Sequence, residues 1–281
     1  MRSVKIKLFL QYTLPKKALS VFGGLLADIK IPWIKNYLIR YFLKNHDVDM
    51  REAVYESPEA YASFNDFFTR HLKPGLRPTA LADLVSPVDG FVSEFGNIEQ
   101  GQLLQAKGKY YSVQDLLVLD KSKSDMFNQG AFATIYLSPK DYHRVHMPCA
   151  GELQHMTHVP GQLFSVQPAT TQRIPKLFAR NERLVLLFET EFGPMAVVFV
   201  GATIVGKIGT RWQGDLPRPK QTKSYDIKES LKQADELGYF KLGSTVILLF
   251  ARNITFTPEL KAGMSIRLGT ALGNILKSNK D

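Results

Sequence analysis

The spacing of hydrophobic and polar residues divides the chain into an N-terminal part that favours helices and a longer part that favours strands. Residues 47–72 look helical, and Ser57 followed by Pro58 is typical of a helix start. From about residue 84, short runs rich in β-branched and aromatic residues are separated by Gly, Pro or charged turns. The runs expected to form strands are 90–94, 131–137, 184–189, 195–200, 245–251 and 265–268, and one charged helix is predicted at 225–237.

This pattern predicts an α+β protein in two parts. Residues 1–50 would form amphipathic, membrane-facing helices, and residues 51–281 would form a compact, mainly antiparallel β-rich domain. The sequence shows no internal repeat. Hydrophobic residues make up 44% of the chain, which excludes a disordered protein, and the single cysteine, Cys149, excludes an intramolecular disulfide.

The charge of the chain is concentrated at its N-terminal end. Of the net charge of +10, residues 1–45 carry +8, from nine basic side chains and one acidic one. Aromatic and aliphatic residues are interleaved with these charges, a composition typical of a segment that lies in a membrane interface. The longest uncharged stretch at this end, residues 18–27, is too short to span a bilayer. The alternative is that these helices simply pack on the body of the protein.

A histidine-rich segment is the first candidate for chemistry. Four of the six histidines lie within residues 143–158, close to Cys149, so a zinc site has to be considered. Pro148 favours extended geometry before it, and in an extended segment His143 and His146 would point apart. We therefore expect no metal ligands here, and we interpret the two histidines as uncoordinated catalytic or structural residues.

Two further stretches could supply a carboxylate and a nucleophile. Asp89, in Ser-Pro-Val-Asp-Gly at 86–90, is either part of an ordinary turn or a fixed carboxylate that orients a histidine. Ser244 follows Gly243 and precedes a strongly apolar run, so it is either a turn residue or a hydroxyl that can reach the preceding carbonyl. A histidine base and an orienting carboxylate would complete a nucleophilic triad with it.

With these motifs together, the chain closely resembles the bacterial phosphatidylserine decarboxylase proenzymes. The resemblance runs from about residue 60 to the C-terminus, and its departures lie mainly at 210–238. One short motif would be weak evidence, whereas several in the family's order, with an aspartate, a histidine and a serine, are strong evidence. The motifs are 67–70, 73–78, 86–90, 142–148, 161–166, 177–183, 201–206 and 242–245.

The resemblance implies that the chain cuts itself. Asp89 would support His146, which would take the proton from Ser244 while the Ser244 hydroxyl attacks the Gly243 carbonyl. The products would be a large chain, 1–243, and a small chain, 244–281, in which Ser244 has become a covalent pyruvoyl group. A neutral imidazole suits this task because its ordinary pKa of about 6.5 lies near working pH.

The resemblance also implies the reaction of the mature enzyme. The pyruvoyl group, the only cofactor expected, would form a Schiff base with phosphatidylserine and accept electrons as CO2 leaves, giving phosphatidylethanolamine for phospholipid biosynthesis. His143 is the candidate for protonating the resulting carbanion or positioning the carboxylate. The expected partners are phosphatidylserine, an anionic membrane surface and a second copy of the chain in a homodimer, without nucleic acid. The expected location is the cytoplasmic face of a bacterial inner membrane, as a peripheral protein.

Two rival hypotheses belong to other classes of protein. A non-catalytic membrane-docked β domain would stay intact, with residues 243–244 as a simple turn. A metal hydrolase built on the cluster from His143 to His158 would bind zinc. Nucleic-acid binding ranks below both, because the body is nearly neutral and the basic segment is strongly apolar.

Overall fold

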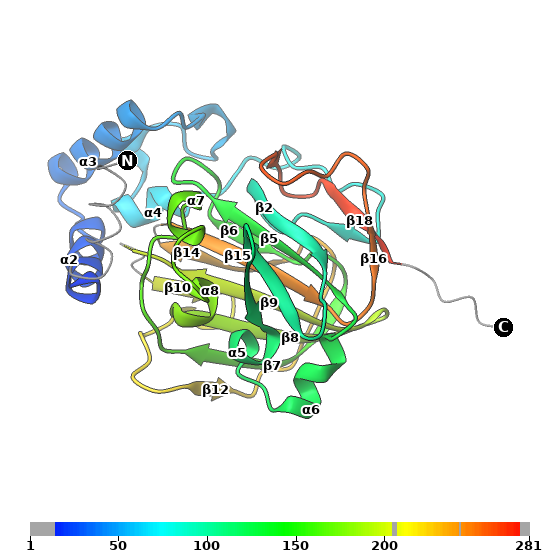
Figure 1. Ribbon diagram of the computed structural model, residues 1–281. Coiled ribbons are helices and arrows are strands. Elements are labelled where there is room, and N and C mark those ends of the chain that lie inside the picture. The colour runs from blue at the N-terminus through cyan, green and yellow to red at the C-terminus, as the bar shows by residue number, and fades with distance from the viewer. Residues whose placement is uncertain (1–14, 204–206, 242, 276–281) are drawn as a thin grey trace.

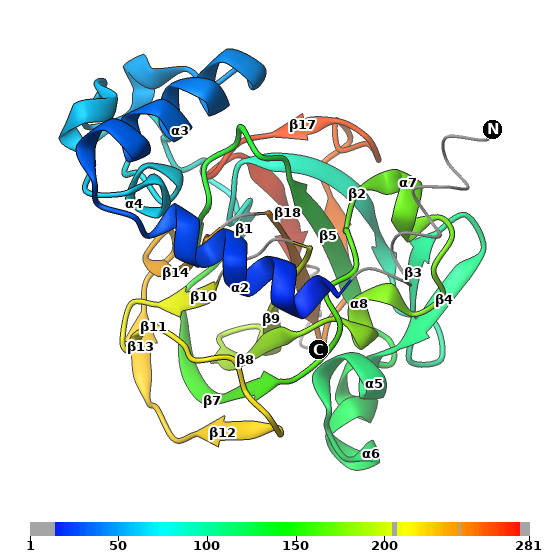
Figure 2. The same cartoon turned by 90° about the vertical axis from the view of Figure 1, so that its left-hand side faces the viewer.

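The protein consists of N-terminal helices beside a body of β-strands. The computed structural model describes residues 15–203, 207–241 and 243–275. Helices α2 (Lys16–Ala27) and α3 (Pro32–Asn45) lie at one side of the body in Figure 1, and Figure 2 shows α2 crossing its surface. The shorter helical segments are η1 (Met50–Glu52), η2 (Pro58–Ala60), α4 (Phe64–Phe68), α5 (Val113–Leu117), α6 (Lys121–Ser124), η3 (Asp125–Phe127), α7 (Pro168–Thr171) and α8 (Leu177–Arg180).

A nine-stranded antiparallel sheet forms the centre of the body. Its main path runs β12-β7-β8-β9-β15-β5-β2-β17, and β13 pairs with β7 beside that path. The bounds of these strands are β2 (Gly90–Asn97), β5 (Ala131–Leu137), β7 (Gly151–Val159), β8 (Arg183–Thr190), β9 (Gly193–Gly201), β12 (Lys223–Tyr225), β13 (Glu229–Leu231), β15 (Ser244–Phe250) and β17 (Ser265–Ile266).

Three smaller sheets complete the body. They have the strand orders β11-β10-β14-β6, β1-β18-β16 and β3-β4. Their strands are β1 (Leu84–Val85), β3 (Gln102–Ala106), β4 (Lys109–Ser112), β6 (Arg144–His146), β10 (Lys207–Thr210), β11 (Gly214–Asp215), β14 (Glu236–Lys241), β16 (Ile254–Phe256) and β18 (Ala271–Ile275).

Strand β15 is buried on both faces because two hydrophobic cores lie on either side of the sheet. Every residue of β15 is buried. Val246 and Leu248 belong to one core, whereas Ile247 and Leu249 belong to the other, as the alternation of side chains along a strand requires. A run that is apolar throughout, instead of alternating with polar residues, is the sequence signature of such a strand.

A third hydrophobic cluster attaches the N-terminal helices to the body. Ile39 of α3 is buried in it together with Phe64, Phe67 and Phe68 of α4. The ring of Phe42 packs edge-on against the three phenylalanine rings of α4, at centroid distances of 5.3, 5.8 and 5.9 Å. Helix α3 is therefore fixed to α4 through aromatic contacts.

The structure confirms the α+β class and the antiparallel strands, and it shows α2 and α3 within the predicted helical segment 1–50, of which residues 1–14 lie outside the described residues. It corrects two helical predictions. Residues 225–237 contain β13 and parts of β12 and β14 instead of a charged helix. Here Leu231 lies in the core and β13 pairs with β7, so tertiary burial and strand pairing outweigh helix propensity. Residues 47–72 form only η1, η2 and α4, because Ser57 and Ser63 each cap a separate short segment.

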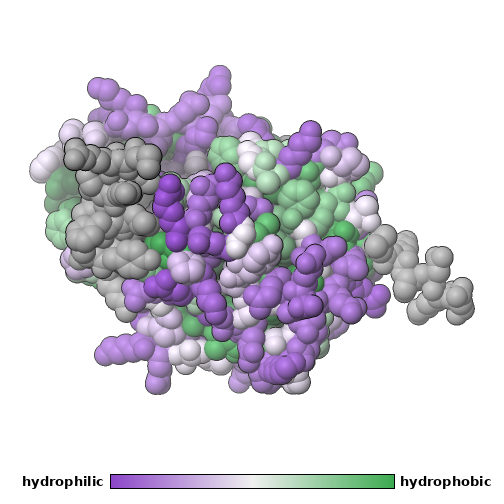
Figure 3. Space-filling model, in the orientation of Figure 1, coloured by the Kyte–Doolittle hydropathy of each residue, from purple (hydrophilic) through white to green (hydrophobic). Residues whose placement is uncertain are grey.

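The surface beside α2 and α3 carries exposed apolar and aromatic side chains. Figure 3 shows hydrophobic surface at its left edge, where Figure 1 places these helices, and a second hydrophobic area at its upper right. Among residues 15–203, 207–241 and 243–275, no helix has the length and apolar character needed to cross a bilayer. In α2, α3 and the link between them, the exposed large hydrophobic residues are Leu19, Val21, Phe22, Leu25, Leu26, Ile31, Trp33, Tyr37 and Tyr41.

We expect Leu248→Ala to lower the free energy of unfolding by about 2–5 kcal/mol, because it opens a cavity in the middle of β15. Leu81→Ala is the matched control, since Leu81 is fully exposed and its loss should change stability by less than about 0.5 kcal/mol. Thermal unfolding followed by circular dichroism measures both. Equal unfolding temperatures for the two variants would contradict the central burial of β15.

Candidate active site

Ser244 begins β15 at an enclosed end of the large sheet. It pairs with Leu137, the last residue of β5, and with Gly201, the last residue of β9. Its side chain is fully buried, and its Oγ has no hydrogen-bond partner among the described residues. A buried hydroxyl without a partner costs about 1–3 kcal/mol, so this arrangement is unfavourable for structure alone.

The residue before it has a backbone conformation that favours glycine. Gly243 has a φ of +55°, in the left-handed region, while the space where a Cβ would lie is open. The backbone conformation at position 243, and not a lack of space for a side chain, therefore explains why this residue is a glycine. The turn at Gly243 leads directly into the buried start of β15.

Ser244 lies at a cavity that the N-terminal helices help to form. The cavity has a volume of about 230 Å³ and is mainly apolar. Phe42 and His46 come from the end of α3, and Phe68 comes from α4. The full lining is Phe42, His46, Phe68, Tyr136, Pro139, Ser165, Val166, Gln167, Ala202, Thr203, Gly243 and Ser244.

His143 does not line this cavity but contacts one of its walls. Its fully buried ring stacks on the Phe68 ring, with a centroid distance of 4.1 Å and an interplanar angle of 19°. Phe68 in turn lines the cavity of Ser244. Burial, helped by the positive charge of Arg70, lowers the pKa of His143 to about 3, so the imidazole is neutral at neutral pH.

His146 has different neighbours. Its Nδ1 lies 2.8 Å from the Ala234 carbonyl oxygen, which can only accept, so Nδ1 carries the proton. Its Nε2 is then the basic nitrogen and accepts a hydrogen bond from the Tyr142 hydroxyl at 3.2 Å. Burial lowers the pKa of His146, while the Ala234 carbonyl and the charges of Glu236 and Asp89 act in the opposite direction.

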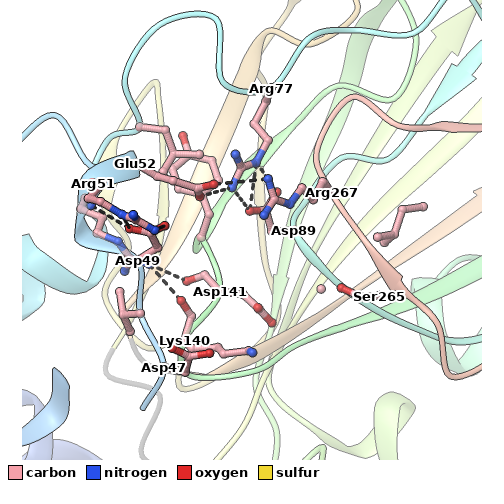
Figure 4. Close-up of a pocket in the computed structure, with 16 residues that line it drawn as sticks. Asp47, Asp49, Arg51, Glu52, Arg77, Asp89, Lys140, Asp141, Ser265 and Arg267 are labelled. Atoms are coloured by element: carbon pink, nitrogen blue, oxygen red, sulfur yellow. Dashed lines mark hydrogen bonds and ion pairs between the residues drawn. The ribbon is translucent and has the colours of Figure 1, made fainter. Parts of the chain in front are cut away.

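Asp89 lies in a second, polar cavity of about 530 Å³, which Figure 4 shows. Its carboxylate accepts hydrogen bonds from the Arg77 guanidinium and, at 2.8 Å, from the Leu268 amide. Tyr142 lines this cavity and also bonds to His146, so it lies between the two predicted residues. The side chains drawn in Figure 4 are those of Asp47, Val48, Asp49, Arg51, Glu52, Arg70, Leu72, Arg77, Asp89, Gly90, Lys140, Asp141, Tyr142, Ser265, Ile266 and Arg267.

The predicted triad is therefore spread over neighbouring sites. Within residues 15–203, 207–241 and 243–275, Asp89, His146 and Ser244 share no direct hydrogen bond. The Asp89 charge is near enough to His146 to raise its pKa, and His143 is linked to the Ser244 cavity through Phe68. The assignment of roles to these residues remains a prediction.

The sequence analysis did not single out Arg77, Phe68 or Tyr142 as site residues. Arg77 and Phe68 lie in the motifs at 73–78 and 67–70, and Tyr142 begins the motif at 142–148. Membership of these motifs was therefore the only feature of the sequence analysis that pointed to the three residues. The contact of Phe68 with His143 joins segments 75 residues apart and that of Arg77 with Asp89 spans 12 residues, whereas Tyr142 meets His146 within one motif.

The clustered histidines also have separate environments. His158 is fully buried and its Nε2 lies 3.2 Å from a carboxylate oxygen of Glu182, whereas His143 stacks on Phe68. In the part of the chain that the structure describes, no three His, Cys, Asp or Glu side chains are grouped as a metal ion would require. The histidine-rich stretch therefore reflects several distinct contacts.

Because the pKa of His143 is low in the folded protein, the folded state should become less stable in acid. The unfolded chain binds a proton at this histidine below about pH 6.5, whereas the folded chain does so only near pH 3. Stability should therefore fall as pH drops from about 6.5 toward 3, by up to about 1.4 kcal/mol per pH unit from this one group.

Phe68→Ala should admit water and raise the pKa of His143, as measured by NMR titration of the imidazole.

Phe64→Ala is the control for this titration, because Phe64 belongs to the same aromatic cluster but does not stack on His143. It should leave the pKa of His143 nearly unchanged. The same titration curve in both variants would show that the Phe68 stack does not shield the imidazole.

Comparisons with known proteins cover nearly the whole chain. A family model described as "Phosphatidylserine decarboxylase" matches residues 64–274, and a second, described as "PSD", matches residues 6–47. Relatives named phosphatidylserine decarboxylase proenzyme include one from Legionella pneumophila (strain Corby), which is 56% identical over 96% of this chain and 98% of its own. Those from Polaromonas sp. (strain JS666 / ATCC BAA-500) and Idiomarina loihiensis are 50% and 48% identical, over 94% and 98% of this chain and 96% and 98% of their own.

Proposed function

The chain belongs to the phosphatidylserine decarboxylase family, whose members are self-processing proenzymes, and on this premise we propose that it cuts itself between Gly243 and Ser244. The activity of the family is decarboxylation of phosphatidylserine to phosphatidylethanolamine, dependent on a pyruvoyl group. The observation that best supports this cleavage site is the buried Ser244 hydroxyl, which follows a left-handed glycine and has no partner among the described residues. The products would be chains 1–243 and 244–281.

The surroundings of Ser244 fit a pyruvoyl group made from that residue. Such a group keeps the carbon atoms of the serine, and the neighbouring cavity of about 230 Å³ leaves room for a small head group. When present, it supplies the electron sink for the electron pair that remains after CO2 leaves. The mainly apolar lining offers water few hydrogen-bond partners, which would favour loss of a carboxylate because charge disperses as the bond breaks.

We assign the proton transfers of self-cleavage to His146. As the Ser244 Oγ bonds to the Gly243 carbonyl carbon and the C–N bond breaks, Nε2 of His146 would accept the hydroxyl proton and return it to the departing amine. Loss of the Ser244 α proton and cleavage of its Cβ–Oγ bond, followed by water addition and ammonia release, would give the pyruvoyl chain. His146 must first give up its hydrogen bond from Tyr142, and the nearby Asp89 charge would stabilise the protonated imidazole.

His143 is our candidate for the decarboxylation step. Its neutral ring keeps one N–H, which would hydrogen-bond to the substrate carboxylate and position it. To protonate the carbon that loses CO2, the ring would first take up a proton from water on its other nitrogen and then pass one on, returning to the neutral form. Its stacking on Phe68, a wall of the Ser244 cavity, supports this role. Phe68 would hold the imidazole plane fixed against the reacting head group.

The N-terminal helices would bring this cavity to its lipid. Trp33, Tyr37 and Tyr41 of α3 are 75%, 67% and 61% exposed, as side chains in a membrane interface would be. Not every basic residue of this segment is available for head groups, since the Nζ of buried Lys35 donates to the carbonyls of Pro58 and Glu59.

The division into a helical membrane-association segment, 1–50, and a catalytic domain, 51–281, is also our proposal. The helical segment also forms part of the Ser244 cavity, because Phe42 and His46 at the end of α3 belong to the cavity wall. We further propose peripheral attachment to an anionic surface at the cytoplasmic face of the bacterial inner membrane, and a homodimer. The exposed apolar and aromatic side chains of α2 and α3 support the attachment.

We expect the denatured mass spectrum of the purified protein to show chains 1–243 and 244–281, the latter with a mass that fits an N-terminal pyruvoyl group. Ser244→Ala, His146→Ala and Asp89→Ala should each leave one intact chain, because each removes a part of the proposed cleavage machinery. Ser265→Ala, a serine at the other cavity, should cut normally. Cleavage of Ser244→Ala, or conversion of phosphatidylserine vesicles by an uncut chain, would contradict the proposal.

Replacing Trp33, Tyr37 and Tyr41 together by serine should weaken binding to vesicles that contain phosphatidylglycerol by about tenfold or more, because it removes the exposed aromatic face of α3. Sedimentation with vesicles measures the bound fraction. Tyr110→Ser is the control, since Tyr110 is 55% exposed on β4, outside the N-terminal helices. Equal binding of the triple variant and the unaltered protein would count against α3 as the membrane contact.

A further inference from the structure

The Arg77 guanidinium lies between two carboxylates, as Figure 4 shows. Its Nε is 3.0 and 3.1 Å from the two Asp89 oxygens, and its Nη2 is 2.6 Å from Asp89 Oδ2. The same Nη2 lies 2.6 Å from Glu52 Oε2. The Arg77 side chain is only 8% exposed, so these contacts are largely shielded from water and from salt.

These contacts fix the orientation of Asp89 from more than one side. The planar guanidinium bonds both carboxylate oxygens, and the Leu268 amide donates a further hydrogen bond to Oδ1 at 2.8 Å. Nη1 of Arg77 donates to the Leu76 carbonyl at 3.1 Å, which holds the guanidinium itself. A lysine could supply the charge but not this forked geometry.

We propose that Arg77 is a positioning residue for self-cleavage: it holds the Asp89 carboxylate in place and balances the negative charge that His146 experiences. This inference rests on the proposed function, because it gives Arg77 a role only through Asp89 and His146. Arg77 does not touch the bond to be cut, so it acts on the reaction through these two residues.

The charged groups around His146 set the direction of the expected effect. Its ring bonds the Ala234 carbonyl and the Tyr142 hydroxyl, and the nearby charges are those of Asp89 and of the paired Glu236 and Arg144. Loss of Arg77 would leave Asp89 without its cation, whereas Glu52 would keep its ion pair with Arg267 at 3.3 Å. The more negative surroundings would favour the imidazolium and raise the pKa of His146.

The test compares the rates at which Arg77→Gln, Arg77→Lys and the unaltered chain release the small chain 244–281. Each chain is made by cell-free synthesis and followed by mass spectrometry between pH 5.5 and 8.5. We expect Arg77→Gln to cut at least about tenfold more slowly at pH 7, with the acid limb of its rate profile moved up by about half a pH unit or more. Arg77→Lys should restore the position of the profile and only part of the rate.

Arg51→Gln is the matched control. Arg51 lines the same cavity but pairs with Asp49 and is 84% exposed, so its loss should leave the rate within about twofold. The thermal unfolding of every variant is compared in the uncut Ser244→Ala background, which separates failed folding from slow cleavage. A slower rate in a variant that unfolds at the normal temperature supports the positioning role.

Two results would overturn the inference. Arg77→Gln could cut at the normal rate, or its slower rate could match a loss of stability with no movement of the pH profile, as a purely structural residue would produce. In both cases Asp89→Asn would still block cleavage, and the proposed function would survive. An unaltered chain that never cuts would instead overturn the proposed function and this inference together.

Discussion

The pairing of β15 with β5 and β9 is the constraint on which the candidate site depends. The strand is buried along its whole length between two hydrophobic cores, so its first residue, Ser244, has a fixed position and no access to bulk water. In its proposed role as a nucleophile, Ser244 would be held by a strand that is buried at every residue. The same pairing would retain the chain that begins at Ser244 after cleavage, since β15 stays between two strands of the large chain.

A chain of aromatic contacts connects α3 to the candidate site. Phe42 of α3 packs against the phenylalanines of α4, and Phe68 of α4 stacks on His143. Both Phe42 and Phe68 also line the cavity of Ser244. The helix that we propose as the membrane contact is therefore part of the wall of the Ser244 cavity, an arrangement that would suit an enzyme whose substrate is a lipid.

The cavities of Ser244 and Asp89 differ in polarity. The cavity of Ser244 is mainly apolar and the adjoining His143 is kept neutral by burial. Asp89 lies instead in a polar cavity, where Arg77 and the Leu268 amide hold its carboxylate. Tyr142 lines this polar cavity and hydrogen-bonds to His146, so the base proposed for self-cleavage is connected to the charged side of the site.

The sequence by itself indicated the family and six of the strands, namely β2, β5, β8, β9, β15 and β17. The apolar runs at 131–137 and 245–251 coincide closely with β5 and β15, because a strand buried on both faces leaves a clear local signature. The motifs carried the resemblance because their residue types and order can be read without a structure. Only the tertiary structure decided that residues 225–237 pair as strands, that Lys35 is buried, and that Arg77 meets Asp89. Each of these outcomes depends on a partner in another element, from 12 to about 80 residues away, whereas local patterns record only what neighbouring residues favour.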